Sequence, residues 1–195
     1  MSAKDPDTGE LYSQDRLLSE VQNLMLAAHE TTANLMTWTL SSIARNPGQQ
    51  NELRNEIRNA MGTDAPTVDN QRKTRGMLQA WRHQVEQHPP NFLIAREAIA
   101  DTFIGSDDDR TFIEAGTTIM VSTEHANRDS GNGVLSFGSG KRFCPGIGLA
   151  RFETEVGLNR FLQRFEVTDT GERGMTSGLT QLPEDTTVTV RKAAI

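Results

Sequence analysis

The sequence contains one cysteine in 195 residues, so it cannot form an internal disulfide, and nothing in it requires an oxidising compartment. It also has no excess of basic residues. Twenty lysines and arginines stand against 26 acidic residues, which gives a net charge of −6. A nucleic-acid-binding protein needs a basic surface to replace the counterions of phosphate, so we expect no nucleic-acid partner.

Long hydrophobic runs are missing as well. The longest is LMLAA, residues 24–28, which is far too short to cross a bilayer. The first ten residues are polar and lack the apolar core of a signal peptide. These absences favour a cytoplasmic location and no membrane segment in this chain.

The rest of the composition is that of a globular protein, with 35% apolar and 24% charged residues. A chain of this length is sufficient for one domain. Residues 1–12 are polar, and we expect them to form a flexible leader. Residues 13–195 are then expected to form a single domain.

Apolar residues at three- and four-residue steps predict a helix from Ser13 to about Arg45, with no proline or glycine inside it. Similar spacing predicts helices over residues 49–61, 72–88 and 145–165. Between them, residues 92–104 and 116–123 are rich in branched side chains and predict short strands, and a hairpin is expected near the C-terminus. The fold class is therefore mainly α with a small β-sheet beside a long central helix.

The cysteine lies in an unusual stretch, FGSGKRFCPG, residues 137–146. A lone cysteine is commonly a small buried hydrophobe. Here, however, glycines permit backbone conformations closed to other residues, and Pro145 favours the start of a helix. The positive end of that helix would stabilise a negatively charged sulfur at Cys144. Such a thiolate is either a nucleophile or a metal ligand.

If Cys144 binds a metal, zinc is disfavoured, because zinc takes several protein ligands and the sequence has no second cysteine. A single thiolate is sufficient when the metal brings its other ligands with it, as haem iron does. Phe137 would then flank the sulfur, and the Arg142 guanidinium would pair with a haem propionate.

This stretch resembles the haem-binding loop of the cytochrome P450 family, Phe-x-x-Gly-x-Arg-x-Cys-x-Gly, at every fixed position. The resemblance implies that Cys144 is the axial ligand of the iron of haem b. It also implies a set of residues around the cofactor: Phe137, Gly138, Arg142, Gly146 and, on the following helix, Ala150.

A second motif, AAHETT at residues 27–32, lies in the long helix. A threonine inside a helix can donate to the carbonyl four residues earlier, so Thr31 can bond to Ala27 and open the helix locally. The stretch resembles the family's oxygen-binding signature, with Ala28 where glycine is usual. By that resemblance Glu30 and Thr31 form the acid–alcohol pair that delivers protons, with O2 as co-substrate.

Further segments resemble the C-terminal half of the cytochrome P450 fold, with its long central helix and its haem-loop helix. Arg96 takes the place of a propionate-binding arginine. Residues 174–183, GMTSGLTQLP, resemble the hairpin tip that overhangs the substrate.

Three features depart from the family pattern. The family's N-terminal half is not represented in the chain. The family's Glu-x-x-Arg pair is missing, and His83 and Glu86 stand in its place. The segment before Phe137 is also shorter than the family's meander, with only residues 130–136 after Asp129.

The resemblance implies a haem-thiolate monooxygenase, or a fragment of one, acting on a small organic substrate with electrons from a ferredoxin or flavoprotein reductase. Two alternatives stay open. The chain is a degenerate, inactive relative, or it is one subunit of a split enzyme whose missing half is supplied by a second chain.

Overall fold

A computed structural model describes residues 3–129, 135–169, 174–178, 180–184 and 187–193. The dominant element is helix α1, Gln14–Arg45, as the apolar spacing predicts. Its start is fixed by Ser13, whose side chain accepts a hydrogen bond from the Arg16 backbone N–H. It ends at Asn46, which also caps the next helix by accepting from the Gln49 N–H.

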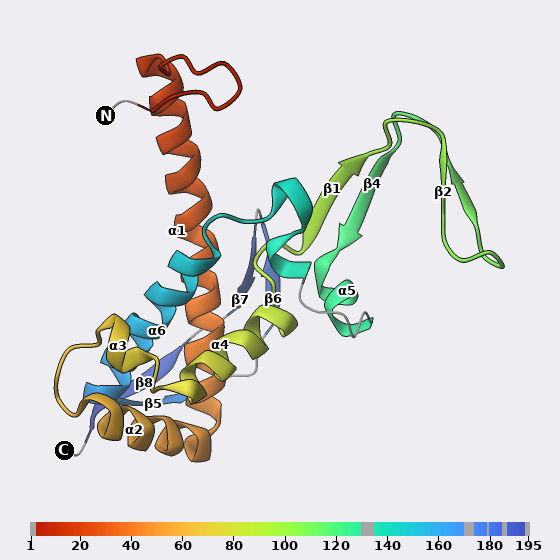
Figure 1. The fold of residues 1–195 in the computed structure, drawn as a ribbon. Helices are drawn as coiled ribbons and strands as arrows, with labels where there is room; N and C mark the ends of the chain where they lie inside the picture. The colour runs from red at the N-terminus through yellow and green to blue at the C-terminus, as the bar shows by residue number, and fades with distance from the viewer. Residues whose placement is uncertain (1–2, 130–134, 170–173, 179, 185–186, 194–195) are drawn as a thin grey trace.

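Further helices surround the second half of α1 (Figure 1). Two 3-10 turns precede the last helix. The elements are α2 (Pro47–Met61), α3 (Val68–Gln71), α4 (Arg75–Gln87), α5 (Thr123–Asp129), η1 (Leu135–Phe137), η2 (Gly140–Arg142) and α6 (Ile147–Arg164). The predicted helices over 49–61, 72–88 and 145–165 are confirmed as α2, α4 and α6. Pro145 precedes the last of these by two residues and does not occupy its first turn, because Gly146 is the N-cap.

The β structure consists of four separate two-stranded antiparallel sheets among the described residues. The pairs are β1 (Leu93–Glu97) with β4 (Thr118–Ser122), β2 (Thr102–Ile104) with β3 (Thr111–Ile113), β5 (Phe165–Asp169) with β8 (Val188–Lys192), and β6 (Met175–Ser177) with β7 (Gln181–Pro183). The C-terminal hairpin expected from the sequence is the β5–β8 pair. The first two pairs form an arm that extends from the helical body (Figure 1).

The turn between β2 and β3 requires a glycine. Gly105 follows β2 with a φ of +116°, and a Cβ there would lie 1.9 Å from the Asp109 carbonyl oxygen. Only glycine therefore fits this turn without backbone movement.

The core lies where α1, α2, α4 and α6 meet. Ile43 of α1, Ile57 of α2, Met77 of α4 and Leu162 of α6 are all buried in one cluster, together with Val167 of β5. Leu53, Ile57 and Met61, at four-residue steps along α2, are all buried. Burial of these side chains, each contributing about 1.5–3 kcal/mol, holds the helices together.

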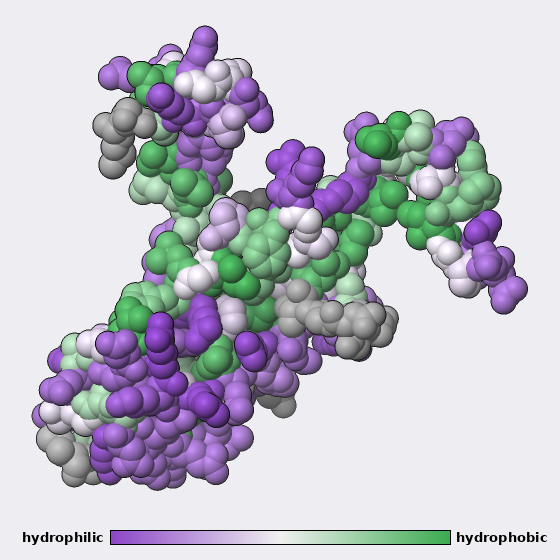
Figure 2. Space-filling model, viewed as in Figure 1, coloured by the Kyte–Doolittle hydropathy of each residue, from purple (hydrophilic) through white to green (hydrophobic). Residues whose placement is uncertain are grey.

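The first half of α1 projects away from this body (Figure 1). Leu24, Met25 and Leu26 are 59%, 69% and 64% exposed, whereas Leu35 and Trp38 farther along the same helix are buried. Apolar side chains accordingly lie on the surface of the projecting part (Figure 2). The apolar stripe continues along the whole helix, but the described residues cover only its second half.

Residues 3–12 precede this exposed part. Lys4 and Leu11 form an isolated antiparallel bridge, and Asp5 pairs with Arg16 of α1 at 3.1 Å. The backbone N–H of Asp7 donates to Asp5, and this bond is the first of the causes that lower the pKa of its carboxyl group. The flexibility expected of the leader stays a prediction.

Candidate haem-thiolate site

Two tight turns hold the segment that carries the thiol. Gly138 follows η1 with a φ of +71°, and its N–H donates to Leu135 at 2.7 Å. Gly140 begins η2 with a φ of +62°. The Cys144 N–H then donates to the Phe137 carbonyl at 2.9 Å, which closes the loop. Two left-handed backbone positions explain why glycine is needed here. Cys144 is half-buried, and its thiol is free.

Helix α6 starts directly behind the cysteine. Gly146 is its N-cap, without a side-chain cap, and a Cβ at Gly146 would lie 3.7 Å from Cys144 Sγ. Ala150 is half-buried in the first turns of the helix, and its N–H donates to Gly146 at 2.9 Å. The sulfur therefore lies beside bare backbone at the positive end of a helix of 18 residues.

The second motif has the local geometry that its sequence predicts. Thr31 Oγ1 donates to the Ala27 carbonyl oxygen at 2.6 Å. Thr31 and Glu30 are half-buried, and Ala28 is exposed. They stand where the exposed part of α1 gives way to its packed part.

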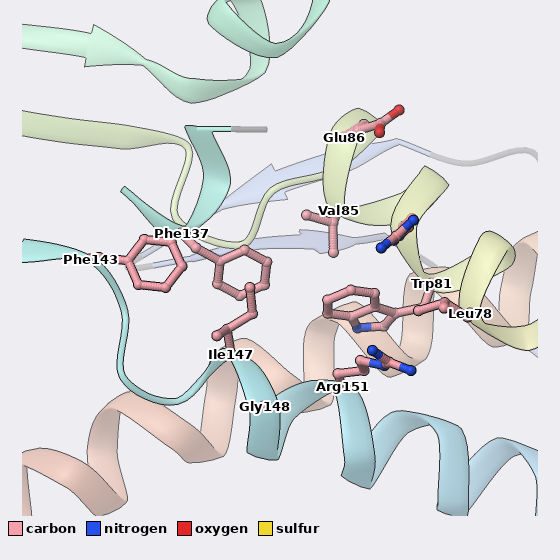
Figure 3. A pocket seen from close by; sticks show the side chains of 10 residues that line it. Leu78, Trp81, Val85, Glu86, Phe137, Phe143, Ile147, Gly148 and Arg151 are labelled. Carbon is pink, nitrogen blue, oxygen red and sulfur yellow. The ribbon is translucent and has the colours of Figure 1, made fainter. Parts of the chain in front are cut away.

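One apolar cluster joins the two motifs. Leu35 is buried one helical turn after Thr31, and it belongs to a cluster with Trp81 of α4. Phe137 and Ile147, on either side of Cys144, pack against that cluster (Figure 3). The thiol loop is thus attached to α1 one turn from the threonine.

Glu30 has a partner that the sequence did not reveal. Thr180, in the turn between β6 and β7, donates its hydroxyl to Glu30 Oε1 at 2.7 Å. Asn34 Nδ2 donates to the same hydroxyl oxygen at 2.7 Å. The loose resemblance of residues 174–183 to a hairpin tip was the one signal near Thr180, but it does not name a partner.

The two arginines expected at the propionates lie at the surface. Arg142, in η2, and Arg96, in β1, are exposed, and neither forms an ion pair with a described residue. Arg96 Nη1 donates only to the adjacent Ala95 carbonyl at 2.8 Å. Both guanidinium groups thus keep donors for an anionic ligand.

A cavity of about 530 Å³ lies behind the thiol loop, between α4 and the start of α6 (Figure 3). Trp81, Val85, Phe137 and Phe143 form much of its apolar wall, and Arg151, which bonds Glu155 at 2.8 Å, lies at its rim. The lining residues are Leu78, Trp81, Arg82, Val85, Glu86, Phe137, Phe143, Ile147, Gly148 and Arg151.

His83 and Glu86 do not replace the missing Glu-x-x-Arg pair. Glu86 lines the cavity behind the thiol loop, whereas His83 lines another, of about 700 Å³, between α2 and α4. No hydrogen bond or ion pair joins them within the described part of the chain. Residues 130–134, most of the shortened segment before Phe137, lie outside the described residues.

Comparison with known proteins decides the family. The sequence matches the family model described as Cytochrome P450 over residues 1–132 and 129–189. The chain belongs to the cytochrome P450 family.

Among curated proteins, this cytochrome P450 chain is 28% identical to cytochrome P450 132 of Mycobacterium tuberculosis over 167 residues, which are 74% of the chain and 35% of the relative. It is 29% identical to the cytokinin hydroxylase of Arabidopsis thaliana over 175 residues, which are 78% of the chain and 33% of that enzyme. The chain thus spans about a third of the length of the curated relatives that it matches.

A solved structure agrees in fold. The crystal structure of a cytochrome P450 superposes with a TM-score of 0.87 at 22% identity, covering 98% of this chain and 48% of that one. The fold of the chain is therefore a partial cytochrome P450 fold. No helix of the described residues is both long and apolar enough to span a membrane.

The described residues fit a haem better than a metal centre built by the protein. No group of three or more histidine, cysteine, aspartate or glutamate side chains gathers among them. A metal at Cys144 would therefore have at most one further ligand of these types among the described residues, which is too few for a zinc centre and suits an iron already held by a porphyrin. Gly146 places no side chain against the sulfur. The individual site residues stay predictions.

Proposed function

We propose that the chain carries the thiolate half of a haem-thiolate monooxygenase. The reaction would insert one atom of O2 into a small organic substrate: RH, O2, two electrons and two protons yield ROH and water. The observation that carries this proposal is the free, half-buried Cys144, held in a double glycine turn beside α1 at the turn where Thr31 bonds back to Ala27.

In this proposal haem b is held through Cys144 and through contacts on both of its faces. Phe137, Gly138 and Gly146 border the sulfur, and Ala150 and Ala28 flank the porphyrin. Arg142 and Arg96 would pair with its propionates, since both guanidinium groups are exposed and form no ion pair with a described residue. When bound, haem supplies the oxygen activation and the redox chemistry that side chains lack.

Two residues of α1 would manage protons. Thr31 holds its hydroxyl proton on the Ala27 carbonyl and can exchange that bond for one to a ligand. Glu30 is an acid one residue away, with one carboxylate oxygen bonded to Thr180. Together they provide an alcohol and an acid at the junction of the exposed and packed parts of the helix.

The electrons would come from a ferredoxin or flavoprotein reductase. An acidic partner suits the thiol loop because Lys141 beside it is exposed. Arg151, which also lies near this loop, is already paired with Glu155 and would contribute less.

A split enzyme is the second candidate, and one observation favours it. The exposed leucines and methionine of α1 present apolar surface that a folded protein normally covers. In the cytochrome P450 used for comparison, about half of the chain has no counterpart here. A second chain supplying that half would cover the helix. An inactive relative is the remaining alternative, with the same fold and no turnover.

Titration with hemin tests the proposal. The reduced, CO-treated protein should show a red-shifted Soret band that Cys144→Ala abolishes. Absence of any haem uptake, alone or with a polypeptide supplying the other half of the fold, would contradict it. Haem uptake with a thiolate spectrum but no turnover would favour the inactive relative, and turnover only with the second polypeptide would favour the split enzyme.

A further inference from the structure

Thr180 and Glu30 are 150 residues apart in the sequence, yet they share a hydrogen bond of 2.7 Å. Thr180 also accepts the Asn34 amide at 2.7 Å. The chemistry fixes both directions, because an amide nitrogen only donates and an ionised carboxylate only accepts. The single hydroxyl proton of Thr180 must therefore point at Glu30.

Burial and two backbone hydrogen bonds hold the Thr180 hydroxyl in place. Thr180 is 1% exposed, so water does not compete for it. The Gly178 N–H donates to the Thr180 carbonyl at 3.1 Å, and the Gln181 N–H donates to the Pro90 carbonyl at 3.0 Å. The turn is thus fixed to the segment that follows α4. The Thr180 hydroxyl that donates to Glu30 therefore has a fixed position.

Asn34 adds orientation. It lies one helical turn after Glu30 on the same face of α1, so both side chains reach the same hydroxyl. With its lone pair engaged by Asn34, the hydroxyl has a preferred rotation that aims its proton at the carboxylate. A hydrogen bond to an ionised carboxylate is among the stronger ones, and it selects one rotamer of a flexible side chain.

We propose that Thr180, with Asn34, is a positioning residue that fixes the direction of the Glu30 carboxylate. This inference rests on the proposed proton-delivery role of Glu30. Glu30 would otherwise sample several rotamers at the edge of the exposed half of α1. Holding one of its oxygens also restricts where the other can lie.

The tie is tested first without haem, by NMR of the whole chain. Thr180→Val keeps the shape of the side chain and removes the hydroxyl. It should shift the Asn34 side-chain amide signals and the Glu30 carboxyl carbon signal, which Glu30→Gln identifies by its loss. Thr180→Ser should restore both signals to nearly their original positions. Unchanged signals in Thr180→Val would overturn the inference.

A matched control is Thr37→Val. The Thr37 hydroxyl donates to the Ala33 carbonyl within the same helix and does not touch Glu30. Loss of this hydroxyl should leave the Glu30 signal unchanged. Equal shifts in both variants would show a general disturbance of α1 and would overturn the inference.

Measurements on the haem-loaded protein distinguish a positioning role of Thr180 from a purely stabilising one. Thr180→Val should raise the share of reducing equivalents released as hydrogen peroxide by about three- to tenfold, with Thr180→Ser within about twofold of the parent. A lower melting temperature with an unchanged share of peroxide would show that Thr180 only stabilises the fold, and it would overturn the inference. If the NMR signals respond but the chain takes up no haem, either alone or with a polypeptide supplying the other half of the fold, the proposed function fails. The positioning role then fails with it, while the hydrogen bonds stand.

Discussion

Trp38 and His88 stack face to face, with ring centroids 3.8 Å apart and ring planes 6° from parallel. Trp38 belongs to the packed half of α1, and His88 is the C-cap of α4, bonded through its N–H to Gln84 at 2.8 Å. The stack thus joins the central helix to the end of α4. It also covers one face of the half-buried imidazole.

This burial predicts a pH dependence of stability. Desolvation lowers the pKa of His88 below its ordinary value of 6.5, Arg128 and His83 act in the same direction, and Glu124 opposes them. In the unfolded chain His88 therefore binds a proton near pH 6.5, whereas in the folded chain it binds one only at lower pH. The free energy of unfolding should fall as the pH drops below that value, and it should gain nothing from this group above it.

Urea unfolding at about pH 7.5 and about pH 5.5 measures the effect, since the two values lie on either side of the histidine pKa. His88→Phe keeps a ring on Trp38 and removes the titrating group, so its change in midpoint between the two pH values should be smaller. An identical change in both proteins would contradict the assignment to His88.

The N-terminus of α4 predicts a second effect. Thr74 makes no side-chain cap, and Glu56 of α2 instead accepts the N–H groups of Arg75 and Gly76 at 2.8 and 2.9 Å. Glu56→Ala should lower the free energy of unfolding by about 1–2 kcal/mol, as loss of an N-cap does. Glu56→Gln keeps one acceptor and should lose less.

The control for this cap is Glu52→Ala, an exposed glutamate on the same helix that has no such contact among the described residues. Its effect should stay within about 0.5 kcal/mol. Chemical denaturation followed by circular dichroism compares the three variants, and equal losses at positions 52 and 56 would contradict the capping role.

Gly146 allows a test of the ligand side of the sulfur. Its φ of −85° suits alanine, and the new Cβ would lie 3.7 Å from Cys144 Sγ, an ordinary contact in the free protein. Gly146→Ala should therefore change the stability of the free chain by less than about 1 kcal/mol. Hemin affinity should fall about tenfold, or ~1.4 kcal/mol, because the methyl group occupies the flank of the ligand sulfur.

Gly148→Ala is the matched change, since a Cβ there meets nothing within 4 Å. Isothermal titration of both variants with hemin gives the comparison. Equal affinities at the two positions would indicate that no flat ligand approaches the thiol from the Gly146 side.

Thr31 and Thr37 form another matched pair on α1. Each donates its hydroxyl to the carbonyl four residues earlier, Thr31 at 2.6 Å and Thr37 at 2.9 Å. In the haem-loaded protein Thr31→Ala should raise the ratio of peroxide to product by about tenfold or more, which is the effect expected when a proton-transfer group is lost. Thr37→Ala should not, and product and peroxide yields per electron pair decide between them.

The helices were predictable because their signals are local. Apolar spacing, the Ser13 cap and the stop at Asn46 act within one or two turns, and they gave α1 correctly. The same spacing did not reveal that the first half of α1 is exposed. The spacing of apolar residues is the same whether or not another element covers them. Their burial depends on the rest of the fold and cannot be predicted from the spacing.

The two motifs were also predictable, and so was the Thr31–Ala27 hydrogen bond, because each lies within a few residues. Thr180 was not, since its bond to Glu30 spans 150 positions and depends on where the last hairpin packs. The division of the strands into four separate pairs was missed for the same reason. Strand propensity does not specify which strands meet.

Glu30, Thr31 and Thr32 occupy the junction between the bare and the packed parts of one continuous helix, and Thr32 is the first buried residue along it. Fraying that starts at Gln14 can travel along α1 until it meets this point, because residues 18–29 of the helix are exposed. Any polypeptide that clamps the bare stretch would slow amide exchange at the threonines without touching them. Hydrogen exchange at Thr31 and Thr32 would then report, through the stiffness of the helix backbone, whether a partner covers the exposed stretch.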